Sequence, residues 1–131
     1  MKPPYVFFII EDNLTSLENL AEELRDLGQI VHPFTNVKDA LKFVAEVMPD
    51  VILADNDDDN GEQDAGVTFC LEMKKKNKGV TTVVMSGRAS AKVASALVDK
   101  KIDGFCPKPF VPEKMLKTFF DKVFIKPLKI N

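Results

Sequence analysis

The sequence has no apolar stretch long enough to span a membrane, which takes about 20 residues in a helix. The apolar run at residues 5–10 is too short, and it ends in two acidic residues rather than in a signal-peptide cleavage site. The two cysteines, Cys70 and Cys106, do not form a metal-ligand spacing, and we expect reduced, buried thiols. We therefore expect a cytoplasmic protein without a membrane partner.

The sequence also lacks a strong net charge, internal repeats and a low-complexity linker. Its formal net charge of −2 gives no reason to expect direct binding to nucleic acid. The lysines at 74–78 are more typical of a solvated helix end than of a binding patch. With 131 residues, 45% of them hydrophobic and 29% charged, the chain fits one globular domain. We expect this domain to span residues 1–124, with a short tail at 125–131.

Short apolar runs of strand length recur along the chain, and several are rich in β-branched residues. They are Val6–Ile10, Ile30–Phe34, Val51–Ala54, Thr82–Met85 and Gly104–Cys106.

Between these runs, apolar residues recur at helical spacing. We expect the first helix to end at Gly28 and the second helix to end at Pro49. The third helix follows Gly66, and the fourth covers about residues 90–100. The fifth helix starts with Pro112. The apolar stripes are Leu14, Leu17, Ala21, Leu24 and Leu27; Val37, Ala40, Leu41, Val44 and Met48; Val67, Cys70, Leu71 and Lys74; Ala94, Leu97 and Val98; and Met115, Leu116, Phe119 and Val123.

This alternation predicts a small doubly wound α/β domain, in which helices cover both faces of a parallel sheet. Ligand sites of such sheets form beyond the carboxyl ends of the strands, where the strand order switches. Polar residues stand at four of these ends. They are Glu11 and Asp12 after the first strand, Asp55 after the third, Ser86 after the fourth and Lys108 after the fifth.

Carboxylates gathered at one edge repel one another, and a divalent cation relieves that repulsion. Mg²⁺ (or Mn²⁺) prefers oxygen ligands and combines carboxylates with water and phosphate oxygens. Asp12 and Asp55 are the expected direct ligands, Glu11 binds directly or through water, and the backbone carbonyl of Asp57 completes the set.

A carboxylate can also attack phosphorus and form an aspartyl-phosphate. Such a transfer needs positioning and cations around the phosphoryl oxygens, which Lys108 and the metal supply. The Ser86 hydroxyl can donate a charge-assisted hydrogen bond to the phosphoryl group. Each residue alone is more typical of a turn or a helix cap, but four strand ends with the needed group favour a phosphoacceptor site with Asp55 as nucleophile.

In this order, the signatures resemble the receiver domain of response regulators in two-component systems, over about residues 5–124. The matching segments are Ile10–Asn13, Ile52–Asp55, Val84–Gly87 and Phe105–Phe110. The resemblance is to a chemotaxis-type single-domain receiver. It implies a three-layer, flavodoxin-like fold whose five-stranded parallel sheet has the order 2-1-3-4-5.

The resemblance further implies that Asp55 accepts a phosphoryl group from a sensor histidine kinase or a histidine phosphotransfer protein. Such a protein is a signalling phosphoacceptor, not an enzyme, although it assists its own phosphotransfer and dephosphorylation. Ser86 would move towards the phosphate, and Phe105 would then swing inward as an aromatic switch. A role for Phe105 as an ordinary core aromatic is an equal alternative. The peptide before Pro109 is typically cis in this family, which would aim Lys108 into the site.

The segment after Asp55 departs from the family pattern. The loop at 56–66 is longer and more acidic than usual and lacks the Met-Pro found in most receivers. Asp57 and Arg88 stand two positions beyond the phosphoacceptor and the switch serine, where residues tune dephosphorylation in the family. We predict that this oppositely charged pair closes over the phosphate.

Three alternatives stay open. The start of the acidic loop at Asn56 resembles an EF-hand calcium loop, although Val67 stands where a bidentate Glu is required. Asp55-Asn56-Asp57 also resembles the nucleophile motif of haloacid-dehalogenase-type phosphatases, which normally lies on the first strand of a longer chain. The third alternative is a binding module that works without phosphorylation.

No DNA-binding or catalytic segment follows the predicted domain, so we expect output through a protein contact. The expected surface combines the fourth helix, the fifth strand and the fifth helix. Phe120 and Phe124 add apolar area there, although a core position or a dimer contact fits them equally. We expect a monomer or a phosphorylation-dependent dimer.

Overall fold

The computed structural model describes residues 4–57, 63–111, 113–115 and 117. Strands and helices alternate along this part of the chain. They are β1 (Val6–Ile10), α1 (Leu14–Asp26), β2 (Ile30–Phe34), α2 (Val37–Phe43), β3 (Val51–Asp55), α3 (Ala65–Lys76), β4 (Thr81–Ser86), α4 (Ala91–Val98) and β5 (Gly104–Pro107). Residues 113–115 and 117 are also helical. Phe119, Phe120, Val123, Phe124 and the predicted tail at 125–131 lie outside the described residues.

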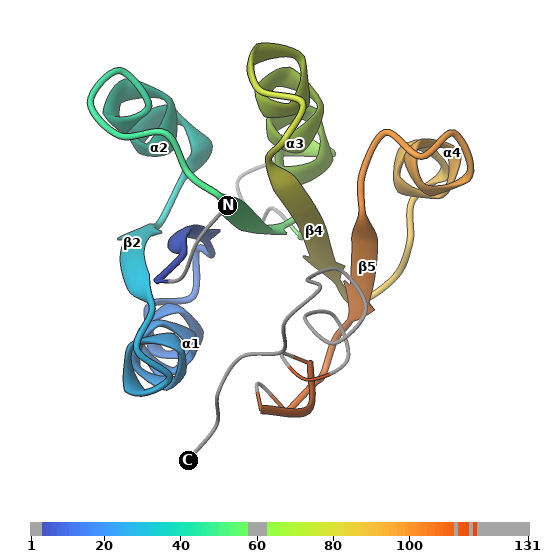
Figure 1. Ribbon diagram of the computed structural model, residues 1–131. Coiled ribbons are helices and arrows are strands. Elements are labelled where there is room, and N and C mark those ends of the chain that lie inside the picture. Colours follow the sequence, from blue (N-terminus) through green and yellow to red (C-terminus); the bar gives the residue numbers. More distant parts are fainter. Residues whose placement is uncertain (1–3, 58–62, 112, 116, 118–131) are drawn as a thin grey trace.

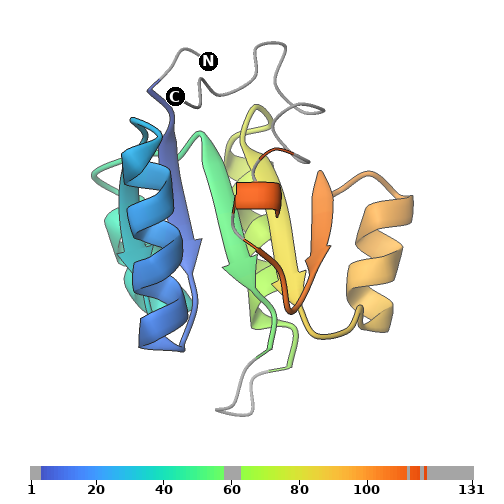
Figure 2. The ribbon, with the colours of Figure 1, turned by 90° about the horizontal axis from the view of Figure 1, so that it is seen from below.

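The five strands form one parallel sheet in the order β2-β1-β3-β4-β5. This confirms the predicted doubly wound fold and its strand order. The strand arrows in Figure 2 all point to the same edge of the sheet. The order reverses at β1, because the chain moves outward to β2 and then returns to place β3 on the other side of β1. That reversal opens the crevice in which such folds bind ligands.

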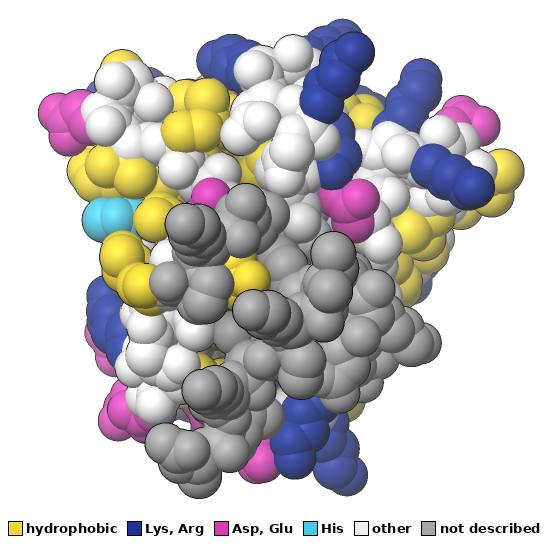
Figure 3. All heavy atoms as spheres, viewed as in Figure 1, with side chains coloured by type: hydrophobic (Ala, Val, Ile, Leu, Met, Phe, Trp, Pro, Cys, Tyr) yellow, Lys and Arg dark blue, Asp and Glu magenta, His cyan; other side chains and the backbone are white. Residues whose placement is uncertain are grey.

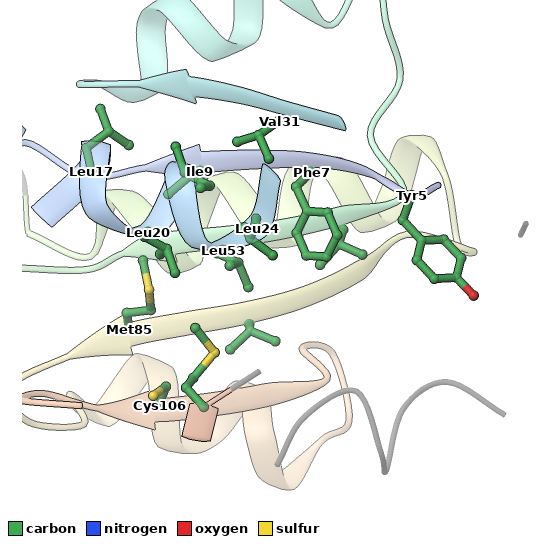
Figure 4. Packing of buried hydrophobic residues seen from close by; sticks show 14 residues of the cluster. Tyr5, Phe7, Ile9, Leu17, Leu20, Leu24, Val31, Leu53, Met85 and Cys106 are labelled. Carbon is green, nitrogen blue, oxygen red and sulfur yellow. The ribbon is translucent and has the colours of Figure 1, made fainter. Parts of the chain in front are cut away.

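Helices cover both faces of the sheet, with α1 on one face and α2, α3 and α4 on the other (Figure 1). Successive strand residues point to opposite faces, so Phe7 and Ile9 pack beneath α1 whereas Phe8 packs among the helices of the other layer. Figure 4 shows leucines of α1 and residues of β1, β3 and β4 meeting in the first of these cores. Because both faces are buried, the central strands read as continuous apolar runs.

The ends of α1 follow from local sequence. Asn13 caps the helix by accepting a hydrogen bond of 2.9 Å from the Ser16 N–H, so the cap is not made by the acidic pair before it. After Leu27 the chain turns at Gly28, whose φ of +80° is readily adopted by glycine. The predicted stop at Gly28 is confirmed.

Two helix predictions need correction. The second helix ends at Phe43, well before Pro49, because the N–H groups of Glu46 and Val47 both donate to the Phe43 carbonyl and close a turn. In α4 the buried residues are Val93 and Ala96, whereas Val98 is 80% exposed. This helix is apolar nearly all round, so spacing alone did not show which stripe faces the sheet.

The third helix carries a wider apolar face than predicted, because Phe69 and Met73 are also buried. It begins at Ala65, one residue before Gly66, and Lys74, Lys75 and Lys76 form its last turn. Cations interact favourably with the negative end of the helix dipole there. Lysine and arginine side chains gather over α3 and α4 in Figure 3, in keeping with a solvated helix end.

Both cysteines are buried and unpaired by disulfides, as predicted. Within the described ranges, none of the helices combines the length and the apolarity that crossing a bilayer requires.

Candidate functional site

The four predicted strand ends meet at the carboxyl edge of the sheet. Asp55 is the last residue of β3, and Ser86, the last residue of β4, stands opposite Pro107 in the register. Backbone hydrogen bonds continue past the strands, from Glu11 N–H to the Phe34 carbonyl at 3.0 Å and from Lys108 N–H to the Ser86 carbonyl at 2.7 Å. These bonds fix the backbone from which the site side chains project.

Three carboxylates from β1 and β3 converge at this edge. Glu11, Asp12 and Asp55 each offer an oxygen, and these oxygens lie within 4.8 Å of one another. Glu11 is 5% exposed and Asp55 9% exposed, so mutual repulsion is poorly screened by water. A compact set of anionic oxygen donors fits a hard divalent cation such as Mg²⁺.

An open cleft of about 420 Å³ lies beside the acidic cluster. Its lining includes the three carboxylates and Asp57, together with Asn36 and Asp39 at the start of α2. Asn36 caps α2 by accepting a hydrogen bond of 2.8 Å from the Asp39 N–H. The acidic cluster is therefore reachable from solvent although Glu11 and Asp55 are buried.

Lys108 joins the carboxylates of β1 and β3. Its Nζ lies 3.0 Å from Glu11 Oε1 and 2.9 Å from Asp55 Oδ1. The peptide between Lys108 and Pro109 is cis, as the family resemblance implies. The lysine thus places one positive charge directly against the predicted nucleophile.

The charges of the cluster perturb one another. Burial raises the pKa of Asp55 to about 8, and the neighbouring Glu11 adds to this rise. Lys108 and the Asp57 amide act in the opposite direction. Burial also pushes the pKa of Glu11 upward, but hydrogen bonding with Asp55 and Lys108 outweighs it and leaves that pKa below its ordinary value. Without a metal ion, the raised pKa favours the protonated form of Asp55 at neutral pH, and a divalent cation competes with that proton.

The pKa of Lys108 changes in the complementary direction. Burial alone would lower it, but the hydrogen bonds and charges of Asp55 and Glu11 raise it above its ordinary value. The ammonium therefore stays charged at neutral pH.

Asp57 ties the β3–α3 loop to the β4–α4 loop. The nearly buried Ser86 hydroxyl donates to Asp57 Oδ1, and the Gly87 N–H donates to Asp57 Oδ2 at 2.8 Å. Asp57 N–H in turn donates to Asp55 Oδ1 at 2.9 Å. Among the described residues no ion pair joins Asp57 to Arg88, whose backbone carbonyl lies 2.7 Å from Ser86 Oγ. The closure of Asp57 and Arg88 over a phosphate stays a prediction.

A second link between these loops was not predicted from the sequence. The buried Asn56 accepts a hydrogen bond from the Val67 N–H at 2.9 Å and donates to Asp64 at 2.8 Å. Asp64 also accepts a hydrogen bond of 2.6 Å from Ser90, the residue that caps α4. These bonds hold the pKa of Asp64 below its ordinary value, and the bond from Ser90 has the largest effect.

The Asn56 bridge bears on the calcium alternative. The Asn56 side-chain oxygen, the first ligand of the proposed EF-hand pattern, is committed to Val67 within the fold. Val67 itself lies in α3 and is fully buried. Asp58, Asn60 and Gly61 of that pattern lie outside the described residues.

The predicted switch aromatic stands apart from the acidic cluster. Phe105, in the middle of β5, is half-buried and packs against the core between the sheet and the layer of α2, α3 and α4. This position suits a core aromatic, and the switch role stays a prediction.

The fold and the site define a class of protein. A doubly wound sheet of this order, with an acidic cluster, a serine and a lysine at its carboxyl edge, has the architecture of a receiver. The sequence model of the response regulator receiver domain matches residues 7–120. The chain therefore belongs to the response regulator receiver domain family, the phosphoacceptor domains of two-component signalling.

Solved structures agree with this assignment. A CheY-like receiver domain protein from Methanospirillum hungatei superposes with a TM-score of 0.78 at 18% identity, over 90% of this chain and 92% of that one. The chemotaxis protein CheY4 of Vibrio cholerae gives 0.74 at 21% identity, over 87% and 94% of the two chains. At these identities the likeness concerns the fold alone. No curated protein sequence matches the chain.

A response regulator from Burkholderia pseudomallei is 25% identical and gives a TM-score of 0.75, over 88% of this chain and 66% of that one. That structure contains a phosphorylated aspartic acid, a calcium ion and citrate.

Proposed function

We propose that the chain accepts a phosphoryl group on Asp55 and thereby switches a protein-interaction surface. The observation that carries this proposal is the contact of 2.9 Å between Lys108 Nζ and Asp55 Oδ1 of a carboxylate that lines the acidic cleft. The phosphorylated aspartic acid in the Burkholderia pseudomallei relative supports it. The donor is a sensor histidine kinase or a histidine phosphotransfer protein, encountered in the cytoplasm.

In the transfer, an Asp55 oxygen forms a bond to phosphorus while the bond between phosphorus and the donor nitrogen breaks. The electron pair of the broken bond stays on that nitrogen, which takes up a proton from solvent. Lys108 balances negative charge on the transferred oxygens, and the hydroxyl of Ser86 and the N–H of Gly87, which donate to the neighbouring Asp57, would serve as hydrogen-bond donors to them.

Glu11, Asp12 and Asp55, with the backbone carbonyl of Asp57, would hold the divalent cation. Mg²⁺ (or Mn²⁺), when bound, supplies a further positive charge that draws the phosphoryl oxygens together with the carboxylates. The fit rests on the convergence of three carboxylate oxygens and on the proton that they otherwise retain.

The output surface would comprise α4, β5 and the helix that follows β5. Val98 is 80% exposed on α4 and offers an apolar contact for a protein partner. Modification of Asp55 would reach this surface through Ser86, which precedes α4, and through Phe105 in β5.

The experiment is incubation with acetyl phosphate and Mg²⁺, followed by intact-mass measurement of the wild type and of Asp55→Asn. We expect one phosphoryl adduct on the wild type and none on the variant. EDTA added beforehand should prevent the adduct from forming on the wild type. A wild type without an adduct would contradict the proposal and favour a phosphorylation-independent binding module. Repeated turnover of phosphate esters, dependent on Asp55, would favour the haloacid-dehalogenase alternative instead.

A further inference from the structure

The carboxylate of Asp57 lies among three donors, and one of them, the Lys108 ammonium, also contacts Asp55. The Ser86 hydroxyl donates to one of its oxygens, and the Gly87 N–H donates to the other at 2.8 Å. The ammonium of Lys108 stands 3.9 Å from that second oxygen while it contacts Asp55 at 2.9 Å. An anionic oxygen pair is thus surrounded by a hydroxyl, an amide and a cation, directly beside the predicted nucleophile.

These donors are the ones that a phosphoryl group on Asp55 would need. Its oxygens carry negative charge and have to be met by hydrogen-bond donors and cations of the protein. We take the Ser86 hydroxyl, the Gly87 amide and the Lys108 ammonium as three donors that would serve this purpose, because Lys108 contacts Asp55 and the other two lie against Asp57, two positions further along the chain. Two of the three are hydrogen-bonded to Asp57.

We propose that Asp57 is a positioning residue that occupies the phosphoryl group's donors in the unmodified protein and competes with that group for them. This inference rests on the proposed phosphorylation of Asp55. The competition holds Ser86 and Gly87 in place before phosphorylation. It also makes the modified state less stable than it would be with a neutral residue at position 57.

The exchange of partners costs little, because the Ser86 hydroxyl and the Asp57 carboxylate each have an alternative partner. One O–H serves one acceptor at a time, and Ser86 Oγ also lies 2.7 Å from the Arg88 carbonyl. The Asp57 side chain is 42% exposed, so its carboxylate can turn to water when displaced. The backbone beneath it stays fixed by the bond of 2.9 Å from Asp57 N–H to Asp55.

Simple charge repulsion between Asp57 and a phosphate also predicts that Asp57→Ala binds a phosphoryl analogue more tightly, so a single substitution does not separate the two explanations. A double-mutant cycle with Ser86 does. Competition requires that Asp57→Ala increase the affinity for the analogue by a smaller factor when the serine hydroxyl is already absent. Repulsion predicts the same gain in both backgrounds, because Ser86→Ala removes no charge.

The probe is beryllofluoride with Mg²⁺, an analogue of the phosphoryl group, titrated into the protein while backbone amide resonances are recorded. We expect Asp57→Ala to tighten binding roughly tenfold, as expected for release of charge-assisted hydrogen bonds. In the Ser86→Ala background the gain should fall to about threefold or less, since only the Gly87 amide is then released. Equal gains in both backgrounds, or weaker binding by Asp57→Ala, would overturn the inference.

A second measurement starts from the unmodified wild type, and this part of it does not depend on the folding of any variant. The Gly87 amide should be protected from hydrogen exchange before any phosphoryl analogue is added, although Gly87 is an exposed residue. In Asp57→Asn, which keeps one acceptor oxygen but no charge, protection should fall about threefold or more. A freely exchanging Gly87 amide in the wild type would overturn the inference. Binding of beryllofluoride to Asp55→Asn as tight as to wild type would instead contradict the proposed function.

Discussion

Lys108 Nζ contacts Asp55 Oδ1 at 2.9 Å and Glu11 Oε1 at 3.0 Å, so one ammonium joins the carboxyl ends of β1 and β3 from the segment after β5. Glu11 and Lys108 are 97 positions apart in the chain, and the contact exists only because the sheet places their strand ends at one edge. The arrangement ties the predicted nucleophile to a cation before any phosphoryl group arrives.

Replacing Lys108 by methionine should slow phosphorylation of Asp55 by roughly 10- to 100-fold, because the developing charge on the phosphoryl oxygens loses its protein cation. The measurement is the rate of adduct formation with acetyl phosphate at saturating Mg²⁺, followed by intact mass. Lys117→Met is the matched control, since Lys117 is 54% exposed and pairs only with Glu113 at 3.4 Å among the described residues. Equal rates for Lys108→Met and the control would show that Lys108 has no part in the transfer.

Asp55→Asn should stabilise the metal-free protein at alkaline pH. The pKa of Asp55 is raised from 3.8 to about 8, so the stability contributed by its protonated form is complete below pH 3.8 and lost as the pH rises through about 8. An asparagine carries no charge at any pH and can donate to Glu11. In EDTA at pH 9, we expect its free energy of unfolding to exceed that of the wild type by about 1–3 kcal/mol.

Urea unfolding followed by circular dichroism, at pH 5 and pH 9, measures this difference. The advantage of Asp55→Asn should be larger at pH 9 than at pH 5, and added Mg²⁺ should reduce it by binding the wild-type carboxylates. Asp26→Asn, at the exposed end of α1, is the control. A variant that is less stable than wild type at both pH values would contradict the assigned direction of the Asp55 pKa.

Gly66→Ala should disturb the site from the side of α3. A Cβ at this position would collide with the Asp55 carbonyl oxygen and lie 2.8 Å from its carbon, and both are backbone atoms that cannot rotate away. We expect a loss of about 1–3 kcal/mol in the free energy of unfolding, together with slower phosphorylation, because α3 has to move away from β3.

Gly79→Ala is the matched control for this substitution. Its Cβ would meet only the Asn77 side-chain oxygen at 3.4 Å, so its stability should stay within about 0.5 kcal/mol of the wild type. A Gly66→Ala protein as stable and as active as Gly79→Ala would show that the close approach of α3 to Asp55 is not required.

Much of the fold could be predicted from the sequence, because central strands buried on both faces appear as short apolar runs. The predicted β3 is one residue shorter than the observed strand, and the predicted β4 is one residue shorter at each end. The face of α4 that packs against the sheet could not be predicted, since the helix has an apolar residue on nearly every side: Val93, Ala94, Leu97 and Val98. Only packing against the sheet decides that Val93 is buried and Val98 exposed.

The convergence of Glu11, Asp55, Ser86 and Lys108 could also be predicted, because the carboxyl ends of parallel strands share one edge. The partners of the loop residues could not. The closure of Asp57 and Arg88 over a phosphate stays a prediction, whereas the hydrogen bonds that the Asp57 carboxylate accepts from Ser86 and Gly87 were not predicted. Such contacts depend on how two loops meet in space, for which sequence spacing carries no signal.

Mapping the phosphorylated residue tests the central claim most directly. After incubation with acetyl phosphate and Mg²⁺, borohydride reduces an aspartyl-phosphate to homoserine, and peptide mass spectrometry then locates the converted residue. The account predicts homoserine at position 55 and unchanged aspartate at positions 12 and 57. Conversion at Asp12 or Asp57 with Asp55 intact would contradict it.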